Sequence, residues 1–304
     1  MNTRHLPQMI RRRQIVDRCF GVLGALMIVL CLGILTLLVG DLVRDALPRL
    51  HADFLTSFPS RRAENAGIKS ALVGTCLVMV VTACVAVPLG VAAGLYLEEY
   101  ARKNWFTAVI EINIANLAGV PSIVWGLMAL GLMVYQFEFS RSILTAGLTL
   151  GLLVLPVVVV ATRESIRAVS QGLREGSYAC GATRWQTVRR LVLPSASSGI
   201  LTGAILALSR AIGETAPLVT IGALSYIAFL PPSPIQKEPP FVSLAWLDSE
   251  FTVLPIQLFN WVSRPDPRFM SNAAAAGVVL LTITLSMNAF AIILRHRLRK
   301  RYSA

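Results

Sequence analysis

Six long apolar stretches determine what this chain can fold into. They cover residues 19–43, 70–97, 107–135, 143–162, 196–229 and 273–294. A transmembrane α-helix needs about 20 mainly apolar residues, and each stretch meets that length. Hydrophobic residues make up 55% of the 304-residue chain and charged residues only 14%, which is too apolar for a soluble domain. The sequence therefore predicts an all-α membrane protein with six transmembrane helices.

The first stretch has one feature of a signal peptide, because Arg11, Arg12 and Arg13 precede it. It is too long for the apolar part of such a peptide, and it lacks an A-x-A cleavage site. We therefore expect this stretch to be retained as the first transmembrane helix.

The basic residues indicate how the chain crosses the membrane. A formal charge of +12 would also suit a nucleic-acid binder, but the Lys and Arg residues flank the apolar stretches instead of forming a separate basic domain. Cytoplasmic loops of membrane proteins are enriched in Lys and Arg. With the N-terminus inside, 18 of the 28 basic residues lie in cytoplasmic segments and 9 lie outside. We therefore expect both termini in the cytoplasm and a location in a bacterial inner membrane. We expect the excess positive charge to contact membrane lipids, and we expect no nucleic-acid partner.

The same topology divides the chain into three parts. Residues 1–68 hold a cytoplasmic tail, the first span and an outer loop. Residues 69–295 form a core domain of five transmembrane helices, and residues 296–304 are a basic cytoplasmic tail. Within the core, 163–194 is a cytoplasmic loop and 230–272 is an outer loop rich in proline and aromatic residues. The outer loop is either a stiff surface for a partner or an ordered lid over the outer mouth.

The cytoplasmic loop 163–194 is long, basic and amphipathic. Residues that mark one helical face recur in it at spacings of three or four: Tyr178, Ala182, Trp185, and Val188 or Arg189. Gly181 would weaken such a helix, so close approach of another backbone explains it better than helix propensity does. Pro194 should end the segment at the membrane boundary. An apolar face on a cytoplasmic helix requires a partner.

Three positions in this loop resemble the EAA signature of permeases from binding-protein-dependent importers. The signature has a Glu, a Gly six residues later and, after nine more residues, a hydrophobic-x-Leu-Pro close. This chain has Glu175, Gly181 and 191–194 (LVLP) at those spacings, with Gly176 and Ser177 where Ala-Ala is usual. The resemblance implies the type I ABC importer permease fold and a loop that docks into a groove of a separate ATPase. The residues implied in this coupling are Glu175, Gly181, Ala182, Trp185 and Pro194.

The sequence contains no nucleotide-binding loop. A Walker A loop needs Gly-Lys-Ser/Thr, and no lysine of this chain follows a glycine. The segments between the apolar stretches are also too short for a nucleotide-binding domain. We therefore expect a non-catalytic subunit with no cofactor of its own, and ATP and Mg on a partner ATPase.

Further motifs resemble the PstA family of phosphate-specific permeases. They are 87–90 (VPLG), 96–100 (YLEEY), 119–127 (GVPSIVWGL), 208–218 (LSRAIGETAPL), 259–267 (FNWVSRPDP) and 287–292 (MNAFAI). This resemblance implies import of inorganic phosphate by alternating access. It also implies a second permease subunit resembling PstC, an ATPase dimer resembling PstB and a periplasmic phosphate-binding protein resembling PstS. A permease for another oxyanion, such as sulfate or molybdate, would have the same EAA loop and is the alternative.

Three ionisable residues inside apolar stretches are functional candidates: Arg210, Glu214 and Glu111. A charged side chain costs about 2.5 to 3.5 kcal/mol at the centre of an inserted helix. Arg210 and Glu214 are four residues apart and would pair on one helical face. We assign Arg210, Glu214 and the neighbouring Thr215 to the substrate pathway, because a guanidinium fork suits phosphate; a purely structural ion pair is the alternative. For Glu111 we expect a role in helix packing.

Two other classes of membrane protein fit less well. A secondary carrier or anion channel would also place Arg and Glu in a span, but it needs no ATPase-docking helix, and the sequence shows no inverted repeat of broken helices. A membrane-embedded enzyme would need paired carboxylates with His, an H-E-x-x-H motif or a nucleophile elbow, none of which occurs. The five cysteines are scattered without C-x-x-C spacing or His partners, so we expect no metal site.

Overall fold

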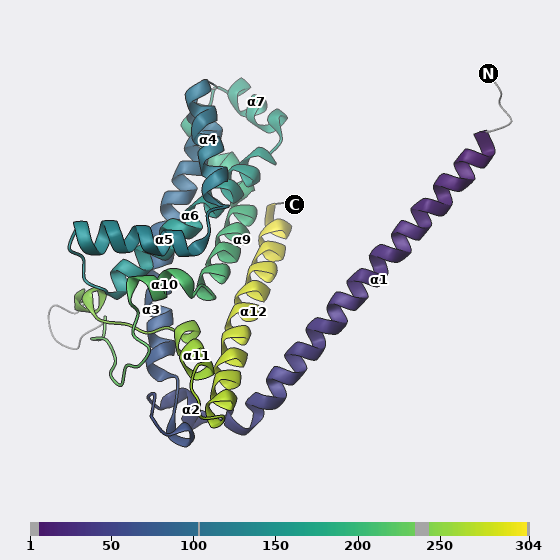
Figure 1. Ribbon diagram of the computed structural model, residues 1–304. Helices are drawn as coiled ribbons and strands as arrows, with labels where there is room; N and C mark the ends of the chain where they lie inside the picture. Colours follow the sequence, from purple (N-terminus) through teal and green to yellow (C-terminus); the bar gives the residue numbers. More distant parts are fainter. Residues whose placement is uncertain (1–5, 103, 235–242, 303–304) are drawn as a thin grey trace.

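The computed structural model describes residues 6–102, 104–234 and 243–302, and this part of the chain is helical without a β-strand (Figure 1). Its α-helices are α1 (Leu6–Ala46), α2 (Ala52–Thr56), α3 (Lys69–Leu95), α4 (Trp105–Leu117), α5 (Ser122–Ala129), α6 (Ile143–Arg167), α7 (Gln171–Ala179), α8 (Arg184–Thr187), α9 (Leu193–Ile212), α10 (Ala216–Ile221), α11 (Leu254–Val262) and α12 (Arg268–Tyr302). The 3₁₀ segments are η2 (Leu47–Arg49), η3 (Ala63–Asn65) and η7 (Ala245–Asp248), and the π-helical segments are η4 (Tyr96–Tyr100), η5 (Leu130–Gln136) and η6 (Val188–Val192). The predicted all-α fold class is confirmed.

Five helical segments of the described chain are long and apolar enough to cross a membrane. They are Arg13–Arg49, Lys69–Tyr100, Ile143–Arg167, Arg184–Ile212 and Arg268–Arg297. These segments overlap the first, second, fourth, fifth and sixth apolar stretches of the sequence. A sixth candidate is the pair formed by α4 and the α5–η5 segment, which passes the same test but is sharply bent.

The third apolar stretch, 107–135, does not form one continuous helix. α4 and α5–η5 meet at residues 118–121 with a bend of 104°. Pro121 explains why the predicted single helix is broken. Its ring fixes φ at −54° and disfavours a helical conformation for Val120 before it.

The fifth apolar stretch, predicted at 196–229, forms a helix that lies earlier in the chain. This helix runs without interruption from Arg184 to Ile212 through α8, η6 and α9. The residues after Ile212 are still apolar, which extended the predicted span. Gly213 and Pro217 nevertheless interrupt the helix there, so α10 is a separate short element.

Helices α3, α6, α9 and α12 form the bundle that carries the other elements (Figure 1). α6 packs against both α3 and α9, and Leu150, Val154 and Val158 of this helix are buried. Small residues allow the helices to approach closely: a Cβ atom at Gly90 of α3 would lie 2.7 Å from Val158 Cγ1. Such contacts are typical of membrane helices, which associate by close packing.

α1 projects away from the bundle along most of its described length (Figure 1). It contacts α12, and Leu42 and Ala46 near its C-terminal end join a buried cluster there. From residue 15 to residue 38 its apolar side chains are exposed on every side. A helix that is apolar all round requires lipid or another protein around it, as a membrane-spanning helix does.

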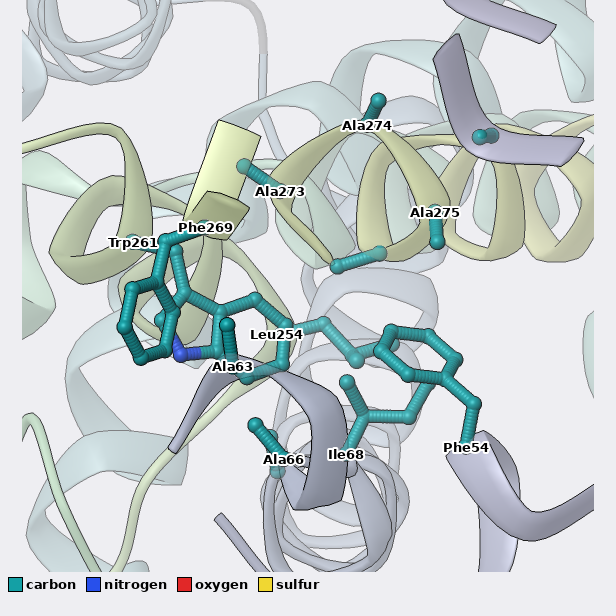
Figure 2. Close-up of a cluster of buried hydrophobic side chains, with 13 residues drawn as sticks. Phe54, Ala63, Ala66, Ile68, Leu254, Trp261, Phe269, Ala273, Ala274 and Ala275 are labelled. Carbon is teal, nitrogen blue, oxygen red and sulfur yellow. The ribbon is translucent and has the colours of Figure 1, made fainter. Parts of the chain in front are cut away.

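Residues 47–68 and 254–268 form a cap over the end of the bundle opposite α7 (Figure 1). Phe54 and Phe269 pack against Trp261, with ring centroids 5.9 and 6.5 Å from it (Figure 2). Arg49 ties the first segment to α12: its Nε donates to Asn272 Oδ1 of α12 at 2.6 Å, and its other two nitrogens donate to backbone carbonyls of the first segment.

The aromatic residues of the outer loop are therefore mostly part of the core. Trp246, Phe251, Trp261 and Phe269 are buried, whereas Phe259 is exposed. The two alternatives for 230–272, a surface for a partner and an ordered lid, both remain predictions, and residues 235–242 lie outside the described chain.

Candidate functional site

The first candidate site lies where the fifth membrane helix ends. Arg210 is in the last turn of α9, and Glu214 follows in the break between α9 and α10. Arg210 Nε lies 3.5 Å from Glu214 Oε1, so the predicted pair forms. It does not form on one helical face, as the sequence predicted, because the helix ends between the two residues. The side chain of Arg210 is 57% exposed and that of Glu214 16% exposed.

Thr215 completes the break as the residue that precedes α10. Its carbonyl accepts hydrogen bonds from the backbone N–H groups of Leu218 and Val219, at 3.1 and 3.0 Å. The side chain is half-buried and does not cap the helix. All three residues assigned to the pathway are thus adjacent at one interruption of the helix.

A second broken helix contacts this interruption. α10 packs against α5, the helix that follows the bend at Pro121. Gly126 allows the contact, since a Cβ atom there would lie 2.5 Å from Pro217 Cα and would collide with Thr220. Membrane transporters form substrate sites from discontinuous helices of this kind, because unwound backbone is tolerated where it borders a cavity.

The position of Arg210 limits what covers this face of α9. In Figure 1, α9 ends level with α5 and α10, between the cap and α7. A charged side chain at the centre of a membrane-inserted helix costs about 2.5 to 3.5 kcal/mol in contact with lipid. The exposed guanidinium therefore requires water, an anion or a polar protein surface on this side.

The second candidate site is the loop between α6 and α9, at the opposite end from the cap. It consists of α7, a turn at residues 180–183 and α8, which continues into α9. Glu175 is exposed and makes no ion pair within the described chain. Tyr178 and Trp185 are 42% and 55% exposed, and Ala182 is half-buried. Four of the five residues assigned to coupling from the sequence thus lie on this loop, and Tyr178 and Trp185 are open to a partner.

Gly181 has a different role from the one its sequence position suggested. It lies in the turn between α7 and α8, with φ +82°, and no other part of the described chain approaches it. Glycine is favoured because an L side chain is strained at such a φ. The prediction of one helical face across Tyr178 to Arg189 is therefore wrong, since the chain turns in the middle of it.

Pro194 does not end the loop segment as predicted. It lies in the first turn of α9, directly after the π-helical segment η6, and the helix passes through it. A proline ring normally clashes with the carbonyl four residues earlier. The wider π turn is the local adjustment that accommodates proline within a membrane helix.

Sequence reasoning missed the residues that hold this loop in place. Arg174 is 8% exposed and binds Glu99 of η4, with Nη2 3.0 Å from Oε1. Ser177 and Thr187 share a hydrogen bond of 2.8 Å between α7 and α8. The YLEEY motif contained Glu99, but no local spacing relates it to an arginine 75 residues away.

Glu111 has the structural role expected of it. Its Oε1 lies 2.8 Å from Arg163 Nη2 of α6, and Glu98 Oε2 lies 3.5 Å from Arg163 Nε. These charges border a polar cleft of about 620 Å³ between η4, α4 and α6. Among the described residues no group of three His, Cys, Asp or Glu side chains is placed to hold a metal ion.

Comparison with known proteins identifies the family. Residues 86–302 match the family described as binding-protein-dependent transport system inner membrane component. The chain belongs to this family. This permease is 34% identical over 238 residues to the phosphate transport system permease protein PstA of Mycobacterium leprae, covering 78% of this chain and 73% of the relative. It is also 29% identical over 286 residues to the probable ABC transporter permease protein YqgI of Bacillus subtilis, covering 91% of this chain and 95% of the relative.

Solved structures show the same fold in this permease. It superposes on a chain of a bacterial alginate ABC transporter, in complex with an alginate-bound periplasmic protein, with a TM-score of 0.63 and 13% identity, covering 96% and 98% of the two chains. For the inward-facing methionine transporter MetNI the TM-score is 0.57 at 15% identity, covering 74% and 94%. The fold is therefore that of the type I ABC importer permeases.

Membership of this family sets the general role. The permease is a multi-pass membrane protein and a non-catalytic subunit of an ABC importer, in which a separate subunit hydrolyses ATP. An importer of this class includes an ATPase and a periplasmic binding protein as partners.

Proposed function

We propose that this permease translocates inorganic phosphate across the bacterial inner membrane. Several relatives at 32 to 34% identity are phosphate transport system permeases PstA, from mycobacteria and Yersinia pestis. The observation that carries the proposal is the exposed Arg210, paired with Glu214 at the break of the fifth membrane helix. By family resemblance the partners are a second permease of the PstC type, a PstB-type ATPase dimer and a PstS-type phosphate-binding protein.

Arg210 supplies what a dehydrated anion needs at this depth. Phosphate that leaves water loses its hydration, and fixed positive charge and hydrogen-bond donors must replace it. A guanidinium presents two parallel N–H groups that match two phosphate oxygens. The pair with Glu214 at 3.5 Å holds the guanidinium near the break without saturating its donors. A passing anion is then bound weakly enough to be released, as conduction requires.

Glu214 favours phosphate over oxyanions that carry no proton. At neutral pH phosphate retains at least one O–H group, whereas sulfate and molybdate are fully ionised. An ionised carboxylate accepts hydrogen bonds but cannot donate them, so it stabilises a protonated phosphate and repels a bare dianion. The adjacent Arg210 and Glu214 thus combine general anion attraction with selection for a proton donor.

The loop between α6 and α9 couples this pathway to the ATPase. Leu173, Tyr178 and Trp185 are exposed on it, although each is apolar or aromatic, and Glu175 lies unpaired within the described chain. Aromatic side chains surrounded by polar groups are typical of a docking surface. From Arg184 the helix continues to Ile212, two residues beyond Arg210, so movement of the docked loop reaches the pathway directly.

Uptake in cells that have this chain as their only phosphate permease of this class tests the proposal. We expect accumulation of radiolabelled phosphate that requires the partner ATPase, and we expect excess sulfate or molybdate to compete poorly. Uptake of sulfate or molybdate in preference to phosphate would transfer the proposal to another oxyanion importer. Phosphate uptake that persists after loss of the ATPase would refute the ATP-driven mechanism.

A further inference from the structure

One buried arginine connects the cytoplasmic loop to two membrane helices. Arg174 of α7 donates from Nε and Nη2 to Glu99 Oε1 at 3.2 and 3.0 Å. Its Nη1 donates to the carbonyl of Val169 at 2.5 Å, and Nη2 also donates to the carbonyl of Ile166 at 2.8 Å. The side chains of Arg174 and Glu99 are 10% and 7% exposed, so water contributes little at this junction.

The acceptors lie on different elements. Glu99 belongs to η4, the π-helical turn that ends the membrane segment of α3. Ile166 is in the last turn of α6, where backbone carbonyls lack partners within the helix, and Val169 follows in the connection to α7. Arg174 therefore fixes α7 to the inner ends of both α3 and α6.

The other side of α7 is joined to the fifth membrane helix. Ser177 and Thr187 form a hydrogen bond of 2.8 Å between α7 and α8, and α8 continues into α9. Arg184 of α8 also lies over the ring of Tyr100 in η4, 5.2 Å from the centroid. A displacement of the loop consequently has defined contacts to three membrane helices.

The chemistry of the Arg174–Glu99 pair indicates that it positions α7 more than it adds to the stability of the fold. Removing water from two charges is costly, and replacing a buried ion pair by apolar residues of similar volume is often neutral or stabilising. What apolar residues cannot reproduce is the fixed direction of four hydrogen bonds from one planar group. The pair therefore defines the orientation of α7 relative to α3 and α6.

We propose that the Arg174–Glu99 pair is the joint that passes movement of the ATPase-docking loop into α3 and α6. Arg174 and Glu99 are positioning residues: they touch neither ATP nor the transported anion. This inference rests on the proposed docking of the loop, and it adds a second route to the direct one through α9.

The test uses the complete importer in proteoliposomes and measures anion imported per ATP hydrolysed. The double variant Arg174→Met with Glu99→Leu removes both charges and leaves neither of them unpaired. We expect it to assemble and to hydrolyse ATP while the transport-to-hydrolysis ratio falls by about tenfold, within the range seen for residues that carry coupling. Arg174→Lys should keep part of the ratio, because it retains one charge contact without the planar fork.

Arg167→Gln is the matched control. Arg167 is also at the inner end of α6 and binds Glu98, but its side chain is 53% exposed. We expect its ratio to be unchanged. If the double variant assembles and its transport-to-hydrolysis ratio is unchanged, the inference is overturned. It is also overturned if fewer importers assemble but those that do have a normal transport-to-hydrolysis ratio.

A crosslinking experiment distinguishes failure of this inference from failure of the proposed docking of the loop. Cys180 is exposed at the tip of the loop and provides the reactive group. If the wild-type importer gives no crosslink from Cys180 to the ATPase, docking of the loop fails and the inference fails with it. If the crosslink forms in both proteins and the ratio is unchanged, only the inference about Arg174 and Glu99 fails. The ratio is measured equally well with another oxyanion, so it does not depend on phosphate being the substrate.

Discussion

Replacing Arg210 by Gln tests the pathway with little damage to the fold. The side chain is 57% exposed, and its contact with Glu214 is an ion pair at 3.5 Å. Surface ion pairs in general contribute about 0.2 to 1 kcal/mol to stability, and the upper end suits this pair because Glu214 is only 16% exposed. Gln also retains most of the aliphatic chain and a similar helix propensity. We therefore expect the free energy of unfolding to fall by about 1 kcal/mol at most, with normal insertion and assembly.

The expected effect on transport is much larger. A hydrogen bond to a charged group contributes about 1.5 to 3 kcal/mol, and a guanidinium fork makes two of them to an oxyanion. Loss of about 3 kcal/mol corresponds to a rate at least about a hundredfold lower. Arg210→Lys should be intermediate, about tenfold below wild type, because it preserves the charge but not the second donor in the plane.

The assay is uptake of radiolabelled phosphate, with co-purification of the ATPase and the second permease as the measure of assembly. Arg61→Gln is the matched control, since it removes one positive charge from an exposed position on the outer cap. We expect this control to transport normally. A normal rate in Arg210→Gln would refute the pathway role, and a failure of that variant to assemble would show that the pair with Glu214 is structural.

Gly181→Leu should abolish ATP-driven uptake, whereas Gly181→Asn should retain much of it because Asn tolerates φ +82°; equal losses would indicate that bulk at the ATPase surface matters instead of the turn. Glu214→Gln should reduce the preference for phosphate over sulfate in competition assays, and an unchanged preference would contradict the proposed selection for a protonated anion. In a background without other cysteines, a membrane-impermeant maleimide applied to intact spheroplasts should label Arg61→Cys and not the native Cys180, while the reverse pattern would invert the topology.

Hydropathy predicted the transmembrane helices correctly where the apolar residues form one continuous helix. It failed where apolar residues continue beyond the end or break of a helix. It measures whether residues suit an apolar environment, not whether the backbone remains helical. Residues 213–229 are mostly apolar apart from Glu214, so they extended the predicted fifth span although Gly213 and Pro217 interrupt the helix. Pro121 disfavours one straight helix through the third stretch, but a proline alone does not set the angle of 104°, and α5 beyond the bend also packs against α10.

The candidate site was predictable to the extent that its residues are neighbours in sequence. Arg210 and Glu214 are four residues apart, so any compact backbone between them allows the ion pair, and it forms although the helix ends there. Arg174 and Glu99 are 75 residues apart, and their pairing depends on the packing of α3 beside α6. A long-range contact between single side chains has no periodic signal, so one sequence cannot reveal it.

The helix from Arg184 to Ile212 connects the two candidate sites. Its 29 residues span about 43 Å at 1.5 Å per residue, more than the hydrocarbon thickness of a bilayer. One end begins in the exposed loop beside Trp185, and the other carries Arg210 at a break. Beyond the π turn and Pro194 the helix is regular up to Ile212, so a shift of its first part would be carried toward Arg210, whereas the break after Ile212 would let α10 stay with α5. Relative motion would then be concentrated between Arg210 and the residues after the break, where a change in distance would alter binding of an anion at the proposed pathway.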